Sequence, residues 1–254
     1  RAVPALPRPD FLALVPAVPA PALDKYPGGP IAAELVGRLL EQTHYARRPI
    51  DDAVSREFLR NYLETNDYSH MILEKEDIDE FEAKYGTTLD DRIRDGDVEP
   101  SYEIFERVIK RLEERVALIK TLTSSTFTFT TDESVVLDRH ELPWPATPAE
   151  AQELWRLRIK HEVLLERLAK IKAAEDREKT AAKANSEKKE APKAAVEKST
   201  DTKSAKELSI KETIDTRYDR ILRSYKEYDS IDVFSTYLSA LTRVFDPHTD
   251  YLAA

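Results

Sequence analysis

In most of the chain after residue 30, apolar residues recur at intervals of three and four positions. This is the spacing of an amphipathic helix. The clearest run follows Pro100, and the side chains that share its apolar face are Ile104, Val108, Leu112, Val116 and Ile119. The other faces of this segment carry Glu, Arg and Lys. The pattern predicts a long helix that buries one stripe against a core.

The same periodicity predicts helices on both sides of that run. Their apolar positions are Ile31, Leu35, Leu39 and Leu40, which share one face; Val54, Phe58, Leu59, Tyr62 and Leu63; Ile78, Phe81 and Tyr85; Leu154, Trp155, Ile159, Val163, Leu164 and Leu168; Leu208, Ile214, Tyr218, Ile221, Leu222 and Tyr225; and Ile231, Val233, Phe234, Tyr237, Leu238, Leu241, Val244 and Phe245. No fixed-period repeat is visible, which argues against a solenoid. We therefore predict an all-α, irregular multi-helix domain.

Residues at the expected helix boundaries agree with this prediction. Asp51 or Asp52 can cap one helix and Thr147 another, because their side-chain oxygens accept backbone N–H groups of the first turn. Gly86 follows the helix that carries Ile78, Phe81 and Tyr85 in the manner of a C-cap. At the end of the last helix, Pro247 disfavours helical geometry in the residue before it.

Residues 1–26 are predicted to form an extended leader, because eight of the 15 prolines fall within the first 30 residues. Proline lacks the backbone N–H that a helix needs and clashes with the preceding turn. The leader's apolar side chains, among them Phe11, Leu12 and Leu14, are candidates for strapping it over the body. A polyproline recognition segment is the alternative interpretation.

Two internal segments also lack the helical pattern. Residues 126–130 alternate Thr and Phe, and we predict an extended connector there. Residues 173–206 consist mostly of Ala, Lys, Glu, Ser and Thr, with Val196 as the only bulky apolar side chain. This composition predicts a disordered or partly helical charged insertion, with an exposed extension of the preceding helix as one form of it. The predicted organisation is a leader followed by one helical domain over 27–254, which ends in a junction over 245–254.

The composition narrows the possible functions. A formal net charge of −9 argues against a general nucleic-acid binder, which neutralises phosphates with Lys and Arg. No apolar run approaches the roughly 20 residues that span a bilayer. Cysteine is absent, which excludes disulfides, thiolate catalysis and Cys-based zinc sites. With only five glycines, the chain offers little material for phosphate-binding loops, and we expect no cofactor.

Candidate catalytic groups are present, but they are not arranged in known motifs. None of the histidines forms an H-E-x-x-H pair or a local cluster; they are His44, His70, His140, His161 and His248. No G-x-S-x-G elbow occurs, and the serines of the lysine-rich insertion have nothing around them that would desolvate a lysine. The carboxylates of residues 74–81 are expected mainly on a solvated helix face. We therefore predict no catalytic, cofactor-binding or metal-binding residue.

One motif after the last helix, Asp246-Pro247-His248-Thr249-Asp250, places two carboxylates beside an imidazole. A metal or acid–base site built on it would need further ligands from elsewhere in the chain. The alternative is a turn, in which Asp246 and Thr249 satisfy backbone groups while Pro247 sets the direction in which the chain leaves the helix. We favour the turn, and a metal-dependent enzyme remains the alternative.

Four stretches in a fixed order carry a family resemblance. They are Tyr-Leu-Glu-Thr-Asn-Asp-Tyr at 62–68 leading to Glu-Asp-Ile-Asp-Glu-Phe at 76–81; Tyr-Glu-Ile-Phe at 102–105 with Arg-Leu-Glu-Glu-Arg-Val at 111–116; Phe-Thr-Thr-Asp-Glu-Ser at 129–134 with Leu-Asp-Arg at 137–139, Pro-Trp-Pro at 143–145 and Glu-Leu-Trp-Arg at 153–156; and Ala-Leu-Thr at 240–242 with Phe-Asp-Pro-His-Thr-Asp-Tyr-Leu at 245–252. Together they resemble the N-terminal region of tail-specific, or C-terminal processing, serine proteases, over residues of about 31–254.

The resemblance implies an exported, periplasmic bacterial endopeptidase that degrades or trims proteins from apolar C-terminal tails. In that family a PDZ domain follows the junction, and a serine–lysine catalytic domain follows the PDZ domain. Neither lies within these 254 residues, so no catalytic residue of the family can be assigned here, and the chain alone should be inactive. Two departures from the family pattern are the Ala253-Ala254 end, where Ser-Pro is usual, and the proline-rich start.

The resemblance assigns the junction motif to joining the helical domain to the PDZ domain. The motif comprises Phe245, Asp246, Pro247, His248, Thr249, Asp250, Tyr251 and Leu252. The expected partners are the PDZ and protease domains of the parent chain and unfolded or tail-exposed protein substrates. An adaptor protein is a further candidate partner. We predict a non-catalytic domain that frames the protease and positions its substrate or partner.

The alternative function is a free-standing helical adaptor that binds proteins through its own surface. Its candidate contacts are Phe127, Phe129 and Trp144, because aromatic side chains dominate the energetics of interfaces. Internal packing of these three rings is the competing interpretation, and we favour it.

Overall fold

The computed structural model describes residues 24–45, 47–187 and 209–253. Over these residues the chain forms helices and no strand, so the predicted all-α class is confirmed. The helices are α1 (Gly29–Thr43), α2 (Asp52–Asn66), α3 (Lys75–Tyr85), α4 (Leu89–Arg94), α5 (Glu99–Thr123), α6 (Pro148–Glu187), α7 (Ile210–Lys226) and α8 (Ser230–Phe245). Residues 1–23 of the predicted leader, and residues 188–206 of the predicted insertion, lie outside the described residues.

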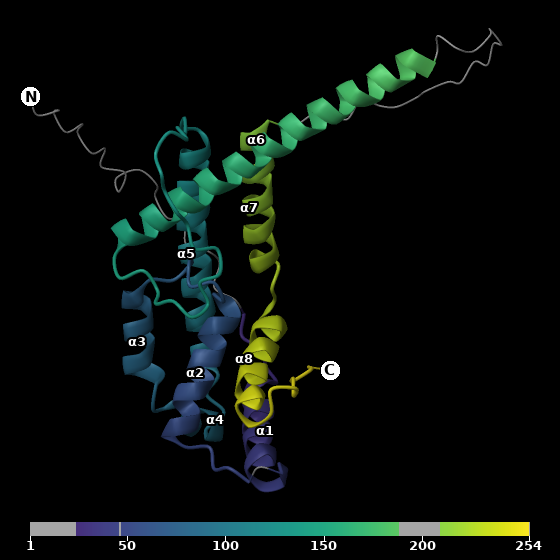
Figure 1. The fold of residues 1–254 in the computed structure, drawn as a ribbon. Helices are drawn as coiled ribbons and strands as arrows, with labels where there is room; N and C mark the ends of the chain where they lie inside the picture. The colour runs from purple at the N-terminus through teal and green to yellow at the C-terminus, as the bar shows by residue number, and fades with distance from the viewer. Residues whose placement is uncertain (1–23, 46, 188–208, 254) are drawn as a thin grey trace, which may run out of the picture.

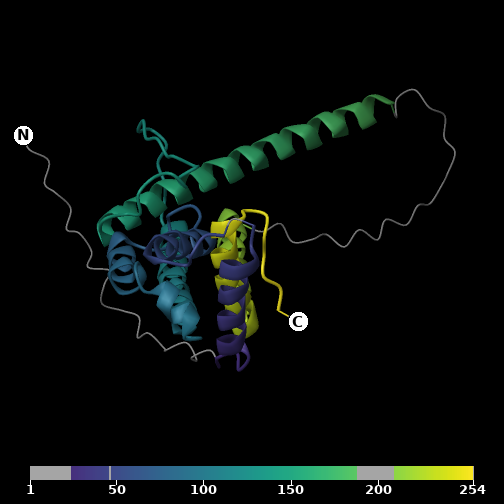
Figure 2. The ribbon, with the colours of Figure 1, turned by 90° about the horizontal axis from the view of Figure 1, so that it is seen from below.

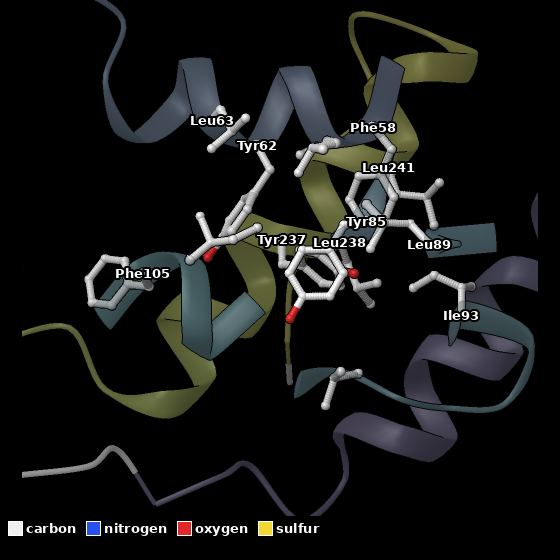
Figure 3. Packing of buried hydrophobic residues seen from close by; sticks show 14 of the residues in the cluster. Phe58, Tyr62, Leu63, Tyr85, Leu89, Ile93, Phe105, Tyr237, Leu238 and Leu241 are labelled. Atoms are coloured by element: carbon white, nitrogen blue, oxygen red, sulfur yellow. The ribbon is translucent and has the colours of Figure 1, made fainter. Parts of the chain in front are cut away.

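The larger of two apolar cores lies among α1 to α4, α8 and the first half of α5, in the lower part of Figure 1. Helices α2 and α8 pack against each other at its centre. The ring centroids of Phe58 and Tyr62 lie 4.5 and 5.1 Å from that of Tyr237. Figure 3 shows side chains of α3 and α4, including Tyr85 and Leu89, pointing toward the same centre. Rings at these separations add to the stabilisation that burial of their surface provides.

Helix α5 joins the two cores because its apolar stripe runs its whole length. Ile104 and Val108 belong to the larger core, whereas Leu112, Val116 and Ile119 belong to the smaller one. All five positions are buried, as the helical spacing predicts. The smaller core is completed by α6 and α7, which both pack on the second half of α5 (Figure 1).

Helix α6 crosses the top of the bundle and projects away from it (Figures 1 and 2). Its first part buries Trp155, Ile159 and Val163 in the smaller core. Residues 173–180 are all exposed, and the helix continues to Glu187. The start of the charged insertion is therefore the exposed helical extension that its composition allows. None of the described helices is long and apolar enough to cross a membrane.

The buried face of α1 is not the one with the bulkiest side chains. Ile31, Leu35 and Leu39 share a face that is exposed, with 73% of Ile31 accessible to solvent, whereas Leu40, predicted on that same face, is buried. The buried face is built mainly from small residues, Gly29, Ala33 and Gly37, followed by Leu40. Small side chains let the α1 backbone approach α4 and α8 closely. The apolar stripe alone therefore predicts the wrong face of this helix.

The predicted helix ends are correct in position, and one differs in geometry. Asp51 accepts hydrogen bonds from the N–H groups of Ala53 and Val54 at 3.0 Å, and the Thr147 hydroxyl accepts the N–H of Glu150 at 3.2 Å. Gly86 does end α3, but with φ of −57° rather than in the left-handed conformation of a glycine C-cap. The short helix α4, which begins three residues later, is not predicted by the apolar pattern.

Candidate functional site

The junction after α8 begins with a firmly packed helix end. Phe245 is buried, and its ring lies 5.5 Å from the imidazole of His44, with which it makes an edge contact. Asp246 leaves the helix with an extended backbone, φ −152° and ψ 118°, which is the geometry that a following proline favours. The predicted helix stop at Asp246-Pro247 is therefore confirmed.

Asp246 organises the turn that follows. Its side-chain Oδ1 accepts the backbone N–H of His248 at 2.9 Å, and its backbone carbonyl accepts the N–H of Thr249 at 3.0 Å. A carboxylate that accepts the N–H two residues further on is a frequent way to stabilise a turn. The turn interpretation of this motif is therefore confirmed for Asp246.

After the turn, the chain folds back along α8 instead of continuing outward. The Thr242 hydroxyl donates to the carbonyl of Thr249 at 2.9 Å. One turn earlier in α8, the Ser239 hydroxyl oxygen accepts the N–H of Tyr251 at 3.0 Å. The Tyr251 ring then packs edge-on against Phe234, at a centroid distance of 5.6 Å. The junction is thus docked on the helix that precedes it (Figure 1).

Ser239 and Thr242 bind the backbone of the junction, and the apolar spacing of α8 does not identify them. They lie three residues apart, within a helix whose surrounding positions are apolar and buried. A polar residue inside a buried stripe needs a hydrogen-bond partner, so the pair could have signalled a backbone segment lying across α8. Only the fold shows that this segment is the junction.

The charged groups of the junction point to different partners. Arg243 binds Asp250, with 2.7 Å between Nη2 and Oδ1, while Asp246 is engaged in the turn. The His248 side chain is exposed. Among the residues that the structure describes, no group of three or more potential ligands is placed to hold a metal ion. The two carboxylates and the imidazole that are adjacent in sequence therefore do not form a common site.

The helix that carries the junction is fixed to the body at its middle and its end. Asn61 of α2 donates from Nδ2 to the carbonyl of Ala240 at 3.2 Å. The edge contact between Phe245 and His44 ties the last turn to the end of α1. Because both contacts are made with packed helices, the start of the junction has a defined position on the domain. Leu252, by contrast, is 87% exposed.

A second polar centre fixes the long connector between α5 and α6 to the body. The buried Asp67 carboxylate accepts the backbone N–H groups of Met71, Ile72 and Leu73 and the indole N–H of Trp144, all at 2.9 to 3.0 Å. Burial raises the pKa of Asp67, and these donors oppose that rise. A carboxylate with this many donors holds the turn after α2 and the connector in one arrangement.

The aromatic residues considered as adaptor contacts pack inward. The Trp144 ring stacks on His70 with 3.6 Å between centroids, and it lies against the larger core. Phe127 and Phe129 are partly buried against the smaller core, where Phe129 also lies 4.9 Å from the Arg167 guanidinium. Internal packing, the favoured interpretation, is therefore correct, and these rings do not form a free surface for a partner.

Comparison with known proteins places the junction and the helical body in one family. A family model described as "Tail specific protease N-terminal domain" matches residues 36–254. Among curated proteins, a "Tail-specific protease" of Haemophilus influenzae (strain ATCC 51907 / DSM 11121 / KW20 / Rd) is 27% identical over 214 residues. The alignment covers 84% of this chain and 26% of the relative. The chain thus spans about a quarter of the length of that relative.

Proposed function

This chain belongs to the family of tail-specific protease N-terminal domains, and we propose that it is the non-catalytic frame of an exported endopeptidase. The enzyme would degrade or trim proteins from their apolar C-terminal tails. The helical domain would hold the PDZ and protease domains of the parent chain in place. It would also position an unfolded or tail-exposed substrate, or a partner protein, for them.

The observation that carries this proposal is the docked junction. A segment that only linked two independent domains would need no contacts with the helix before it. Here the Thr249 carbonyl and the Tyr251 N–H are bound by hydroxyl groups of α8. Helix α8 is in turn packed between α1, α2 and α5. A domain that follows Tyr251 would therefore start from a fixed point and in a fixed direction.

The non-catalytic part of the proposal is tested by incubating the purified chain with an unfolded protein that ends in an apolar tail. We expect the chain to show no cleavage of the kind that a serine-directed inhibitor abolishes. An active serine protease in a parallel reaction is the positive control. Inhibitor-sensitive turnover by the chain would contradict a non-catalytic role. Cross-linking in the same mixture measures positioning, and we expect the substrate to be captured on the helical domain.

The framing part is tested with the double variant Ser239→Ala and Thr242→Val, which removes the hydroxyl groups that bind the junction. Amide exchange at residues 249–251 should become faster, while exchange in α2 and the rest of α8 stays unchanged. Thr236→Val is the matched control, because among the described residues the hydroxyl of this half-buried threonine on α8 bonds only the carbonyl of Asp232. If the double variant exchanges like the control, the junction is not held by α8 and the framing role fails.

A further inference from the structure

Helix α1 carries an exposed row of apolar side chains, Ile31, Leu35 and Leu39, which we call the α1 row. Each of the three is about half exposed or more. Their spacing of four residues places them next to one another along one side of the helix. At the end of the row, Leu39 and the exposed Tyr45 help to line a solvent-open concavity of about 520 Å³. A continuous apolar surface of this kind commonly marks a contact with another part of a protein.

The α1 row faces away from α4 and borders the side of the helix that meets α8. Successive residues of a helix are turned by about 100°. Gly37 faces α4, since a Cβ atom added to it would lie 2.8 Å from that helix, and Leu35 is therefore about 160° round from α4. Gly29 faces α8, where an added Cβ atom would lie 3.5 Å from the Phe234 ring. Val36 lies between the direction of Gly29 and that of the row, and it packs against the larger core.

The junction runs along the same flank of the domain. It begins at the end of α1, where the Phe245 ring contacts His44. It reaches the start of α1 at Tyr251, whose ring contacts Phe234, the residue that Gly29 faces. Figure 2 shows the last part of the junction beside α1. The chain therefore leaves the domain next to the helix that carries the α1 row.

The chemistry of the row favours an apolar partner rather than a charged one. Glu34 and Arg38, which border the row, form an ion pair with each other. Covering the row would remove three bulky apolar side chains from water, which is favourable in proportion to the area buried. Leu252, the residue after the docked part of the junction, is itself apolar and exposed.

A domain that continues from Leu252 is the partner that the position of the exit selects. Most of the length of the Haemophilus relative lies outside the region that this chain matches. A domain tethered at Leu252 would meet the row at a local concentration that a separate molecule reaches only in concentrated solution. Its starting point is also fixed, because Tyr251 is bound to α8.

We propose that the α1 row is the surface on which the domain that follows Leu252 docks through an apolar face of its own. The inference rests on the proposed function, since it names the surface with which the frame would hold the next domain of the parent chain. A tether alone leaves a domain free to turn about its attachment point. A second contact at the α1 row would restrain its orientation as well.

The test compares thiol labelling in this 254-residue chain and in the parent chain that continues beyond it. The 254 residues contain no cysteine, so Leu35→Cys introduces a single thiol into them. Mass spectrometry of the peptide that carries residue 35 measures its rate of reaction with a soluble maleimide. We expect the reaction to be at least about tenfold slower in the parent chain, because the docked domain must open before the thiol can react.

Leu168→Cys is the matched control, because Leu168 is 53% exposed and Leu35 is 55% exposed. Leu168 lies on α6, away from the junction, so its thiol should react equally fast in the two chains. A second arm adds Leu35→Asp to a Leu39→Cys parent chain. The buried charge should release the docked domain and return the labelling of residue 39 to the rate in the short chain.

The second arm needs its own controls. In the short chain, Leu35→Asp should leave the melting temperature nearly unchanged, because the side chain is exposed there. Leu168→Asp in the Leu39→Cys parent chain introduces the same charge elsewhere and should leave the labelling of residue 39 slow. Fast labelling with Leu168→Asp would mean that the charge, rather than its position on the row, releases the domain, which would contradict the proposal.

Three results would overturn the proposal directly. One is an equal rate for Leu35→Cys in the short chain and in the parent chain. Another is slow labelling of Leu35→Cys in the short chain at every concentration, since a segment of this chain would then cover the row. The third is slow labelling in the short chain only at high concentration, which would assign the row to a second copy.

These outcomes are separate from those that decide the proposed function. Exchange at residues 249–251 and turnover are measured on the short chain, whereas docking on the α1 row is measured by comparison with the parent chain. Equal labelling rates together with a firmly held junction would remove only the docking surface. If the double variant Ser239→Ala and Thr242→Val exchanges like its control, the framing role fails whatever the labelling rates are.

Discussion

At the level of single residues, Asp77 shows what the sequence alone cannot reveal. The acidic residues of 74–81 were expected mainly on a solvated helix face, and Asp79 and Glu80 do lie at the surface. Asp77 is instead completely buried, where it binds Arg107 at 2.6 Å and Arg111 at 2.8 Å. Both arginines come from α5, so the contact depends on how α3 packs against it. Local spacing predicts the acidic helix start but not this partner.

Replacing Asp77 by Asn should lower the free energy of unfolding by about 3 kcal/mol, since removal of one partner leaves the other charges of a buried pair uncompensated. The measurement is urea denaturation followed by circular dichroism. Asp79→Asn is the matched control on the same helix. Its exposed ion pair with Lys75 should be worth less than about 0.5 kcal/mol. Similar losses in the two variants would contradict the role assigned to Asp77.

Because Asp77 is ionised in the fold, we expect the stability of the protein to depend on pH. Burial opposes ionisation of Asp77, but the hydrogen bonds from Arg111 and Arg107 outweigh it and hold its pKa below the ordinary value of 3.8. The ionised carboxylate therefore stabilises the fold fully above that ordinary value. This stabilisation is lost as the pH falls through the lower, folded-state pKa.

Between about pH 5 and about pH 3, the melting temperature of the unmodified chain should therefore fall more steeply than that of Asp77→Asn. Comparison of the two proteins matters because other carboxylates titrate in the same range, and their contribution is common to both. Thermal melts at several pH values measure the two slopes. Parallel slopes would show that the carboxylate of Asp77 is not stabilised by its arginines.

At the level of elements, the helices and most of their ends could be predicted because they depend on local spacing and capping. The buried face of α1 could not, because it is decided by how closely the partner helices approach. A Cβ atom added to Gly37 would lie 2.8 Å from Cγ2 of Ile93 in α4. Ile93 is fully buried, so it has little room to move away. Close packing, rather than bulk, therefore selects this face.

Gly37→Ala should lower the free energy of unfolding by about 1–2 kcal/mol. Alanine favours a helix over glycine by about 1 kcal/mol, but overpacking of a core usually costs about 1–3 kcal/mol. Arg38→Ala, next to it on the exposed side of α1, should change stability by less than about 0.5 kcal/mol. A rise in melting temperature for Gly37→Ala would show that α1 and α4 are not in close contact.

Some features of the candidate site likewise follow from the local sequence, whereas others depend on long-range contacts. The helix stop at Asp246-Pro247 and the Asp246 turn follow from local chemistry, and both were predicted. The fold-back on Ser239 and Thr242 depends on contacts that no spacing rule gives.

At the level of the whole molecule, two apolar cores share one helix. The larger core gathers α1 to α4 and α8, while the smaller one holds α6, α7 and the second half of α5. Besides α5, the partly buried side chains of Ile72 and Tyr225 pack against both. The junction is attached to the larger core, where Phe245 is buried and Tyr251 packs. The proposed framing role thus depends on one of the two packing units.

This division predicts that the smaller core can loosen by itself. Ile159→Ala removes a fully buried side chain of α6 and should cost about 2–5 kcal/mol in that core. Local opening follows the contacts that are lost, so amide exchange should rise in α6, α7 and the second half of α5, while α2 and α8 keep their protection. Hydrogen-exchange mass spectrometry measures both regions in one experiment.

Leu168→Ala, at a half-exposed position of the same helix, is the control and should change exchange in neither region. If Ile159→Ala instead raises exchange equally in α2 and α8, the two cores unfold as one unit, because α5 then transmits the loss along its whole length.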